Sequence, residues 1–115
     1  MHELSIALNI LEIVGEHARL HGAGRVVAVH LNLGPLSGVS IDSLRSAYDL
    51  AREGSTLEDA VLSITEVPLV LHCSRCEADR PAMSHQQLCC IDCGTASAEV
   101  VSGRELDIVS LEIES

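Results

Sequence analysis

Aromatic residues are almost absent from this 115-residue sequence. It has no phenylalanine and no tryptophan, and Tyr48 is its only tyrosine. The hydrophobic core must therefore be aliphatic, and the chain offers no aromatic platform on which nucleic-acid bases could stack. Hydrophobic residues still make up 47% of the sequence, which suffices for one modest core. We expect one compact domain with at most a small additional lobe, and the length leaves no room for a large enzyme.

Basic residues are also scarce. Seven basic residues, all of them arginines, face seventeen aspartates and glutamates, which gives a formal net charge of −10. Neutralising the phosphates of nucleic acid requires many basic side chains, so we expect no nucleic-acid partner. A cation or a basic protein surface suits this charge better, although an acidic surface also favours solubility without any partner.

Long hydrophobic runs are missing as well. The longest apolar stretches, such as residues 67–71, are far shorter than the roughly 20 residues of a membrane-spanning helix, so we expect a soluble protein with no membrane partner. The sequence begins Met1-His2-Glu3, without the basic start and apolar run of a secretory signal. We therefore expect a cytoplasmic location with reduced thiols, which argues against a disulfide framework.

Cysteines are the most informative residues that are present. Two Cys-x-x-Cys motifs, Cys73 to Cys76 and Cys90 to Cys93, are separated by thirteen residues. Two such turns facing each other supply four thiolates, the ligand set that tetrahedral Zn²⁺ accepts. Four protein ligands leave no open coordination position, so the expected zinc site is structural, and the metal would supply much of the folding free energy of its lobe. The same ligands can hold iron, as in rubredoxin-like electron carriers.

The fifth cysteine, Cys89, adjoins the second motif. Only Cys90 has the Cys-x-x-Cys spacing to Cys93, so we interpret Cys89 as a spare thiol rather than a ligand. A thiol in this position is free to oxidise or to crosslink.

His2 is a second candidate metal ligand. The free α-amine, the amide nitrogens of residues 2 and 3, and the imidazole can lie in one plane around a small divalent cation. Such a nitrogen environment favours Ni²⁺ or Cu²⁺ over Zn²⁺. Taken alone, a histidine at position 2 is more often an ordinary surface residue.

No catalytic grouping is visible in the rest of the sequence. His17 and His21 lie one helical turn apart, as in zinc proteases, but the glutamate that should follow the first histidine is missing. We interpret this pair as a solvated helix end whose histidines are favoured by the helix dipole. Because neither a nucleophile paired with a base nor a glycine-rich phosphate loop is present, we expect no enzymatic activity.

Hydrophobic periodicity predicts two helices and three strands outside the cysteine region. The expected elements are, in chain order, helix 4–21, strand 26–33, a second helix capped by Ser40, and strands 61–67 and 106–113. Asp42 falls in the first turn of the second helix, where the helix dipole favours a carboxylate.

This order of elements predicts an α+β fold, with two helices packed on a small three-stranded antiparallel sheet and an inserted zinc-ribbon lobe. The expected α+β domain comprises residues 1–69 and 103–115, and the zinc-binding lobe comprises residues 70–102. The expected core stripe of the first helix is Leu4, Ala7, Leu8, Leu11, Val14 and Ala18, widened by Ile6, Ile10 and Ile13. The expected apolar face of the last strand is Val109, Leu111 and Ile113.

Three segments carry a resemblance to a known family. They are the start Met1-His2-Glu3-Leu4-Ser5, residues 33–39 with the sequence LGPLSGV, and the cysteine motifs followed by residues 105–114 with the sequence ELDIVSLEIE. Together they resemble the HypA/HybF family of hydrogenase maturation nickel metallochaperones. The resemblance covers essentially the whole chain.

The resemblance implies a role for each metal site. In this family the amino-terminal amine and the histidine at position 2 bind Ni(II), and the adjoining glutamate assists. The resemblance therefore places a transient nickel cargo at Met1, His2 and Glu3, in residues 1–69 plus 103–115, with Asp42 as an acid near the nickel. It places structural Zn(II) at Cys73, Cys76, Cys90 and Cys93.

The implied partners are an accessory nickel-handling GTPase and a [NiFe]-hydrogenase large subunit, and some family members also serve urease maturation proteins. The sequence departs from the family pattern at Ile91, which replaces a proline in the second cysteine motif, and in the second helix, which lacks the usual phenylalanines. Two alternative functions are a zinc-ribbon interaction adaptor without nickel transfer and a rubredoxin-like iron electron carrier.

Overall fold

The computed structural model describes residues 3–22 and 24–114 and divides into two compact units. Unit 1 comprises Met1–Leu31, Val39–Thr65 and Asp107–Ser115, and unit 2 comprises Asn32–Gly38 and Glu66–Leu106. Unit 2 therefore extends beyond residues 70–102 on both sides and also takes in an earlier segment. Within the described ranges, no helix is long and apolar enough to cross a membrane.

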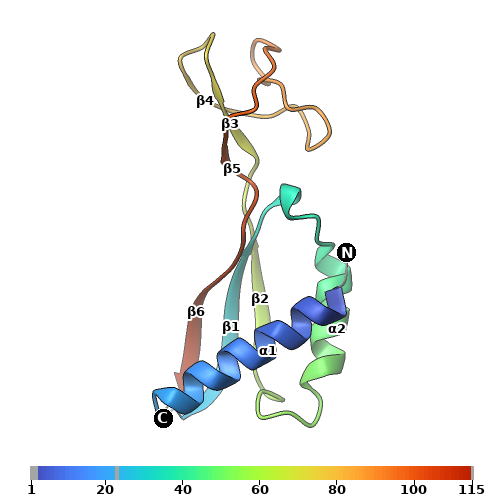
Figure 1. The fold of residues 1–115 in the computed structure, drawn as a ribbon, viewed down its shortest axis with the longest axis vertical. Coiled ribbons are helices and arrows are strands. Elements are labelled where there is room, and N and C mark those ends of the chain that lie inside the picture. The colour runs from blue at the N-terminus through green and yellow to red at the C-terminus, as the bar shows by residue number, and fades with distance from the viewer. Residues whose placement is uncertain (1–2, 23, 115) are drawn as a thin grey trace. The chain divides into compact units, whose positions relative to one another are not determined.

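Unit 1 contains the two α-helices and a three-stranded sheet (Figure 1). Its elements are α1 (Glu3–Leu20), β1 (Arg25–Leu33), α2 (Ile41–Arg52), β2 (Val61–Glu66) and β6 (Leu106–Glu114). Each of the three strands also extends by one or two residues into unit 2. The strand order is β2-β1-β6. The predicted α+β fold, with two helices packed on a small sheet, is thereby confirmed.

The central strand β1 pairs with β6 in the antiparallel direction that the sequence predicts. At the end of β1, the N–H of Gly34 donates to the carbonyl oxygen of Glu105 at 2.8 Å. At the beginning of β1, the guanidinium of Arg25 lies 3.2 Å from the carboxylate of Glu114. The beginning of one strand therefore meets the end of the other.

The other neighbour, β2, runs in the same direction as β1. The N–H of Val67 donates to the carbonyl oxygen of Leu33 at 2.8 Å, just past the end of β2. Arg25 and Asp59 form an ion pair of 3.2 Å just before its beginning. Helix α2 carries the chain back between the two strands, which is the kind of connection that parallel strands need. The antiparallel pairing expected from the sequence thus applies to β6, whereas β2 is parallel to β1.

One aliphatic core holds unit 1 together. Its buried members are Ala7, Ile10, Val14, Val26, Val29, Leu31, Leu44, Tyr48, Leu57, Ala60 and Leu62. The hydroxyl of Tyr48 donates to the carbonyl oxygen of Ala60 at 2.7 Å, so the only aromatic residue is both buried and hydrogen-bonded. Burial raises the pKa of Tyr48, which stays neutral and structural.

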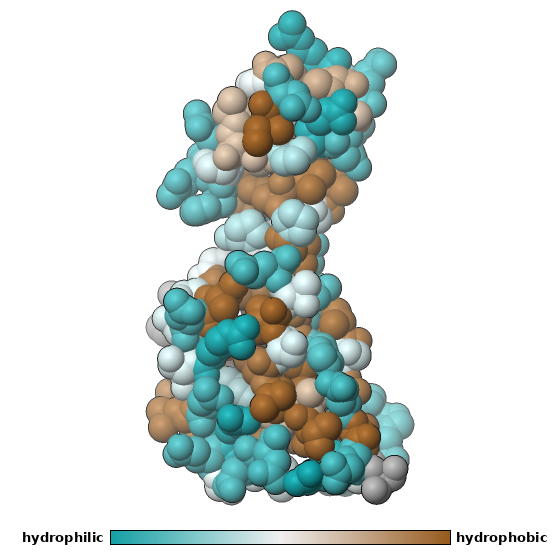
Figure 2. Space-filling view, turned by 180° about the vertical axis from the view of Figure 1, so that it is seen from behind, coloured by the Kyte–Doolittle hydropathy of each residue, from teal (hydrophilic) through white to brown (hydrophobic). Residues whose placement is uncertain are grey.

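The face of α1 that packs on this core is narrower than the predicted stripe. Ala7, Ile10 and Val14 are buried as expected, but Leu4 and Leu8 are 50% and 52% exposed. The helix carries apolar residues on several faces, and the sequence alone does not decide which of them packs. Large hydrophobic side chains of α1 therefore reach the surface. Figure 2, which shows the side turned away from the viewer in Figure 1, also has hydrophobic residues in brown at the surface among hydrophilic residues in teal.

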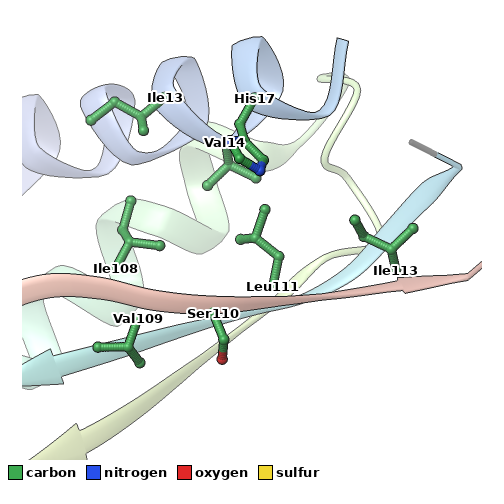
Figure 3. A pocket seen from close by; sticks show the side chains of 8 residues that line it. All are labelled: Ile13, Val14, His17, Ile108, Val109, Ser110, Leu111 and Ile113. Carbon is green, nitrogen blue, oxygen red and sulfur yellow. The ribbon is translucent and has the colours of Figure 1, made fainter. Parts of the chain in front are cut away.

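The side chains of β6 alternate less regularly than predicted. Ile108 and Leu111 pack against the core and point toward α1, whereas Val109 and Ser110 point away from it (Figure 3). Core residues three positions apart cannot share a face of a regular strand, so the alternation is interrupted between them. The predicted apolar face is wrong for Val109, which is exposed.

Unit 2 contains a short 3-10 helix, η1 (Pro35–Ser37), and a second three-stranded sheet. The strands are β3 (Val70–Cys73), β4 (Ala78–Pro81) and β5 (Val100–Ser102), in the order β4-β3-β5 with antiparallel pairing on both sides. The buried hydrophobic residues of the described part of this unit are Leu33, Leu71, Cys73 and Cys90. Two of these four are cysteines, so thiols replace a conventional core.

Candidate metal sites

Four cysteines come together in unit 2. The sulfur atoms of Cys73, Cys76, Cys90 and Cys93 all lie within 4.8 Å of one another. Two of the sulfur separations are 3.5 Å, between Cys73 and Cys93, and 3.9 Å, between Cys76 and Cys90. Zn–S bonds of roughly 2.3 Å in a tetrahedron separate the sulfurs by about 3.8 Å. The cluster therefore fits Zn²⁺, and its members are the four cysteines that the spacing indicated.

Two turns present these sulfurs. Cys73 ends β3, and the next turn brings back Cys76, whose N–H donates to Cys73 Sγ at 3.4 Å. Cys90 forms an isolated β-bridge with Ala82. Gly94, whose φ is 76°, closes the second turn by donating its N–H to the carbonyl oxygen of Cys90 at 2.8 Å. A side chain at this φ would be strained, so glycine suits the position.

The four thiols hold their protons unequally. Hydrogen bonding with Cys93 and the other close sulfurs raises the pKa of Cys76 to about 12. The hydroxyl of Thr95, 3.2 Å from the sulfur of Cys93, forms a hydrogen bond that lowers the pKa of Cys93 to about 6. A metal ion must displace the proton of Cys76, so binding releases protons and weakens on acidification. Thr95 is a member of the site that the cysteine spacing did not reveal.

Cys89 lies beside the cluster but outside it. Its N–H donates to the carbonyl oxygen of Gln87, and its own carbonyl accepts from the N–H of Met83. It also forms a β-bridge with Ala96, and its thiol is not among the grouped ligand atoms. Successive residues of an extended segment point to opposite sides, so the inward Cys90 leaves Cys89 pointing out.

Two of the four predicted nickel ligands, Glu3 and Asp42, lie among the described residues. Met1 and His2 lie outside the residues that the structure describes. Glu3 opens α1, and its Oε2 accepts a hydrogen bond from the N–H of Ser40 at 3.3 Å. Ser40 is the N-cap residue of α2, as predicted, and Asp42 is exposed in the first turn of that helix. The starts of the two helices are thus linked, which no sequence motif indicated.

The other histidines have carboxylate partners or are exposed. His30 Nε2 lies 2.7 Å from a carboxylate oxygen of Glu112, and His72 Nδ1 lies 3.0 Å from one of Asp79. The hydrogen bond to Asp79 raises the pKa of His72. His85 is exposed. Among the described residues, the four cysteines form the one group of three or more potential metal ligands.

Comparison with known proteins points to one family. The family model described as hydrogenase/urease nickel incorporation, metallochaperone, HypA, matches residues 1–113. A hydrogenase maturation factor HypA from Roseiflexus sp. is 43% identical over 114 residues, which covers 99% of this chain and 93% of that protein. The hydrogenase maturation factor HypA of Chloroflexus aurantiacus is 43% identical over 112 residues, which covers 97% of this chain and 98% of that protein.

Solved structures agree with this match. The solution structure of the nickel metallochaperone HypA from Helicobacter pylori has a TM-score of 0.67 and 26% identity, and the comparison covers 98% of this chain and 97% of that one. A second solution structure of a HypA protein has a TM-score of 0.71, also at 26% identity. The family resemblance inferred from the sequence is therefore confirmed. This chain belongs to the HypA family of hydrogenase and urease nickel-incorporation metallochaperones.

Proposed function

We propose that this chain is a nickel metallochaperone, which carries Ni(II) as transient cargo during [NiFe]-hydrogenase maturation and holds Zn(II) as a structural ion. The observation that carries the proposal is the family match over residues 1–113, because this range includes both the amino terminus and the four cysteines. The two sites differ in chemistry. A thiolate tetrahedron suits Zn²⁺, whereas a nitrogen-rich chain end suits Ni²⁺.

The nickel ligands in this proposal are the α-amine of Met1, the neighbouring backbone amides and the imidazole of His2. Glu3 and Asp42 supply carboxylates. The contact between Glu3 and Ser40 supports this grouping, since it holds the start of α1 against the start of α2. The amine and amides must lose protons to bind, so nickel affinity falls on acidification, with the reference pKa of an α-amine near ~7.7 to 8.0 setting part of the range.

The proposed division of labour follows the two units. Unit 1 carries the nickel ligands, and the zinc-tied unit 2 offers a docking surface to partners. These partners are an accessory nickel-handling GTPase, the [NiFe]-hydrogenase large subunit and urease maturation proteins. Catalysis is no part of the role, because four cysteine ligands leave the zinc no open position for a substrate. A reducing cytoplasm suits the five free thiols.

Replacing His2 by alanine should abolish stoichiometric tight nickel binding, because the chelate loses its imidazole. Zinc content and fold should not change, since the cysteine cluster lies in the other unit. Calorimetric titration of the zinc-loaded chain with NiCl₂ measures this, with the exposed His85→Ala as the matched control. Unchanged tight binding in His2→Ala would rule the terminal site out, and a chain that never binds nickel would be the zinc-only adaptor.

Adding one residue before Met1 should damage tight nickel binding as severely as the loss of His2. The extension converts the α-amine into an amide and moves the new amine out of the chelate. The measurement is the same titration on chains with and without the extra residue. Full affinity in the extended chain would mean that the amine is not a ligand.

A further inference from the structure

The carboxyl end of α1 carries two imidazoles in contact. His17 and His21 are both exposed, and their ring centroids are 4.2 Å apart with 29° between the ring planes. They are four residues apart, the spacing at which histidines on one helix face can hold a single metal ion. The two imidazole rings therefore already lie side by side.

The hydrogen bonding of this pair leaves nitrogen lone pairs available. His21 Nδ1 lies 2.9 Å from the carbonyl oxygen of His17. A carbonyl oxygen only accepts, so this contact places the proton of neutral His21 on Nδ1 and the lone pair on Nε2. Histidines that bind metals commonly donate their other ring N–H to a backbone carbonyl in this way. Among the described residues, none hydrogen-bonds to the ring nitrogens of His17.

The surroundings of the pair favour a cation. His17 lies in the last turn of α1, where the helix dipole attracts positive charge. The nearby cation Arg19 is paired with the carboxylate of Glu16. Figure 3 shows His17 beside the apolar groove between α1 and β6, with Val14 and Leu111 close to it. These aliphatic side chains offer the imidazole no competing partner.

We propose that His17 and His21 form a second divalent-metal site, which takes an ion that prefers imidazole nitrogen, with Ni²⁺ as the ion this chain handles. His21 keeps its hydrogen bond to the carbonyl oxygen of His17, the ring of His17 turns from the stacked arrangement so that one of its nitrogens faces the ion beside His21 Nε2, and water fills the remaining positions. Exposed side chains make such a change at low cost. With two protein ligands, this site is weaker than the amino-terminal chelate.

This site is distinct from the one at the amino terminus. An 18-residue helix is about 27 Å long at a rise of 1.5 Å per residue, so one ion cannot bind both ends of α1. The proposal goes beyond the solvated helix end expected from the sequence. It does not depend on the function proposed above, because the pair can bind metal whether or not His2 does.

Nickel titration of zinc-loaded chains with an unextended amino terminus tests the second site. The unmodified chain should show a tight event and a weaker event, each approaching one nickel per chain. The His17→Ala/His21→Ala double variant should keep the tight event alone, and His2→Ala should keep the weaker event alone. His85→Ala, which removes an exposed histidine without a neighbouring one, should keep both.

Nuclear magnetic resonance gives an independent reading. Nickel bound to two imidazoles and water is paramagnetic, so in His2→Ala it should broaden amide signals near Ala18 to His21, and the further loss of His17 and His21 should abolish the broadening. A weaker event that persists in the double variant, or broadening elsewhere on α1, would overturn the assignment. Retained circular dichroism of α1 in every variant shows that folding is unaffected.

Discussion

Replacing Cys73 by serine should remove zinc from the chain and unfold unit 2 while unit 1 stays folded. A serine hydroxyl is a poor zinc ligand, so only three cysteine ligands remain for the metal. The lost ligand is the one at the end of β3. Apparent zinc-binding free energies in small structural sites are roughly 10 to 16 kcal/mol, which exceeds the roughly 2 to 7 kcal/mol that a folded unit of the length of unit 2 has in total. The expected change in unit 2 is therefore complete rather than partial.

The two units differ in the hydrophobic burial that could stabilise each of them without a metal. The connected core of buried hydrophobic residues lies wholly in unit 1, whereas Leu33 and Leu71 are the buried hydrophobic residues of unit 2 that are not cysteines. Two aliphatic side chains cannot offset the conformational entropy of residues 32–38 and 66–106, which make up unit 2. Unit 2 thus depends on metal, and unit 1 does not.

Zinc content measured by mass spectrometry, together with hydrogen exchange of β3 to β5 and of α1, tests this expectation. Cys89→Ser is the matched control, because Cys89 adjoins the cluster without belonging to it. The control should keep zinc and protection in both units. Protection of β3 in Cys73→Ser equal to that of the unmodified chain would contradict the dependence on metal.

Gly34→Ala should destabilise the chain by on the order of 3 kcal/mol, because the added methyl group would enter backbone. A Cβ at Gly34 would lie 2.2 Å from the carbonyl carbon and oxygen of Gly103. The facing chain cannot retreat easily, since Leu36 N–H donates to the oxygen of Gly103 at 2.8 Å, and a Cβ at Gly103 would itself lie 2.8 Å from a side-chain atom of Leu69. The φ of Gly34, −99°, is ordinary, so the close approach alone requires glycine.

Urea denaturation followed separately by signals of each unit measures the effect of Gly34→Ala. The matched control is Gly15→Ala in α1, where the nearest atom to the new Cβ would be Thr56 Oγ1 at 3.9 Å. Removing a glycine from a helix interior should stabilise unit 1 by about 0.5 to 1 kcal/mol. If Gly34→Ala stabilised the chain as this control does, the two segments around Gly34 and Gly103 could not lie as close together as the structure places them.

Local signals predicted much of this molecule. The Cys-x-x-Cys spacing identified the four sulfurs that meet, because such a turn geometrically confines its two side chains. Ser40 marked the start of α2, since a cap is a contact within a few residues. The strands of unit 1 were found to within a residue or two from alternation alone.

The features that could not be predicted from the sequence depend on contacts between distant segments. α1 is apolar on several faces, so the exposure of Leu4 and Leu8, which were expected in the core, is decided by the sheet and α2. The short strands β3 to β5 have too few residues to show a period. The hydrogen bond between Glu3 and Ser40 joins residues 37 positions apart, and no local sequence pattern connects the two.

The discontinuity of unit 1 sets an order of events during protein synthesis. A ribosome delivers α1, β1, α2 and β2 before residues 67–106, and it delivers residues 107–115, which supply almost all of β6, only after those. Until those arrive, the helices can pack but β1 remains an open edge, which is prone to pairing with other chains. The sheet of unit 1 is therefore finished only after all four cysteines have been translated.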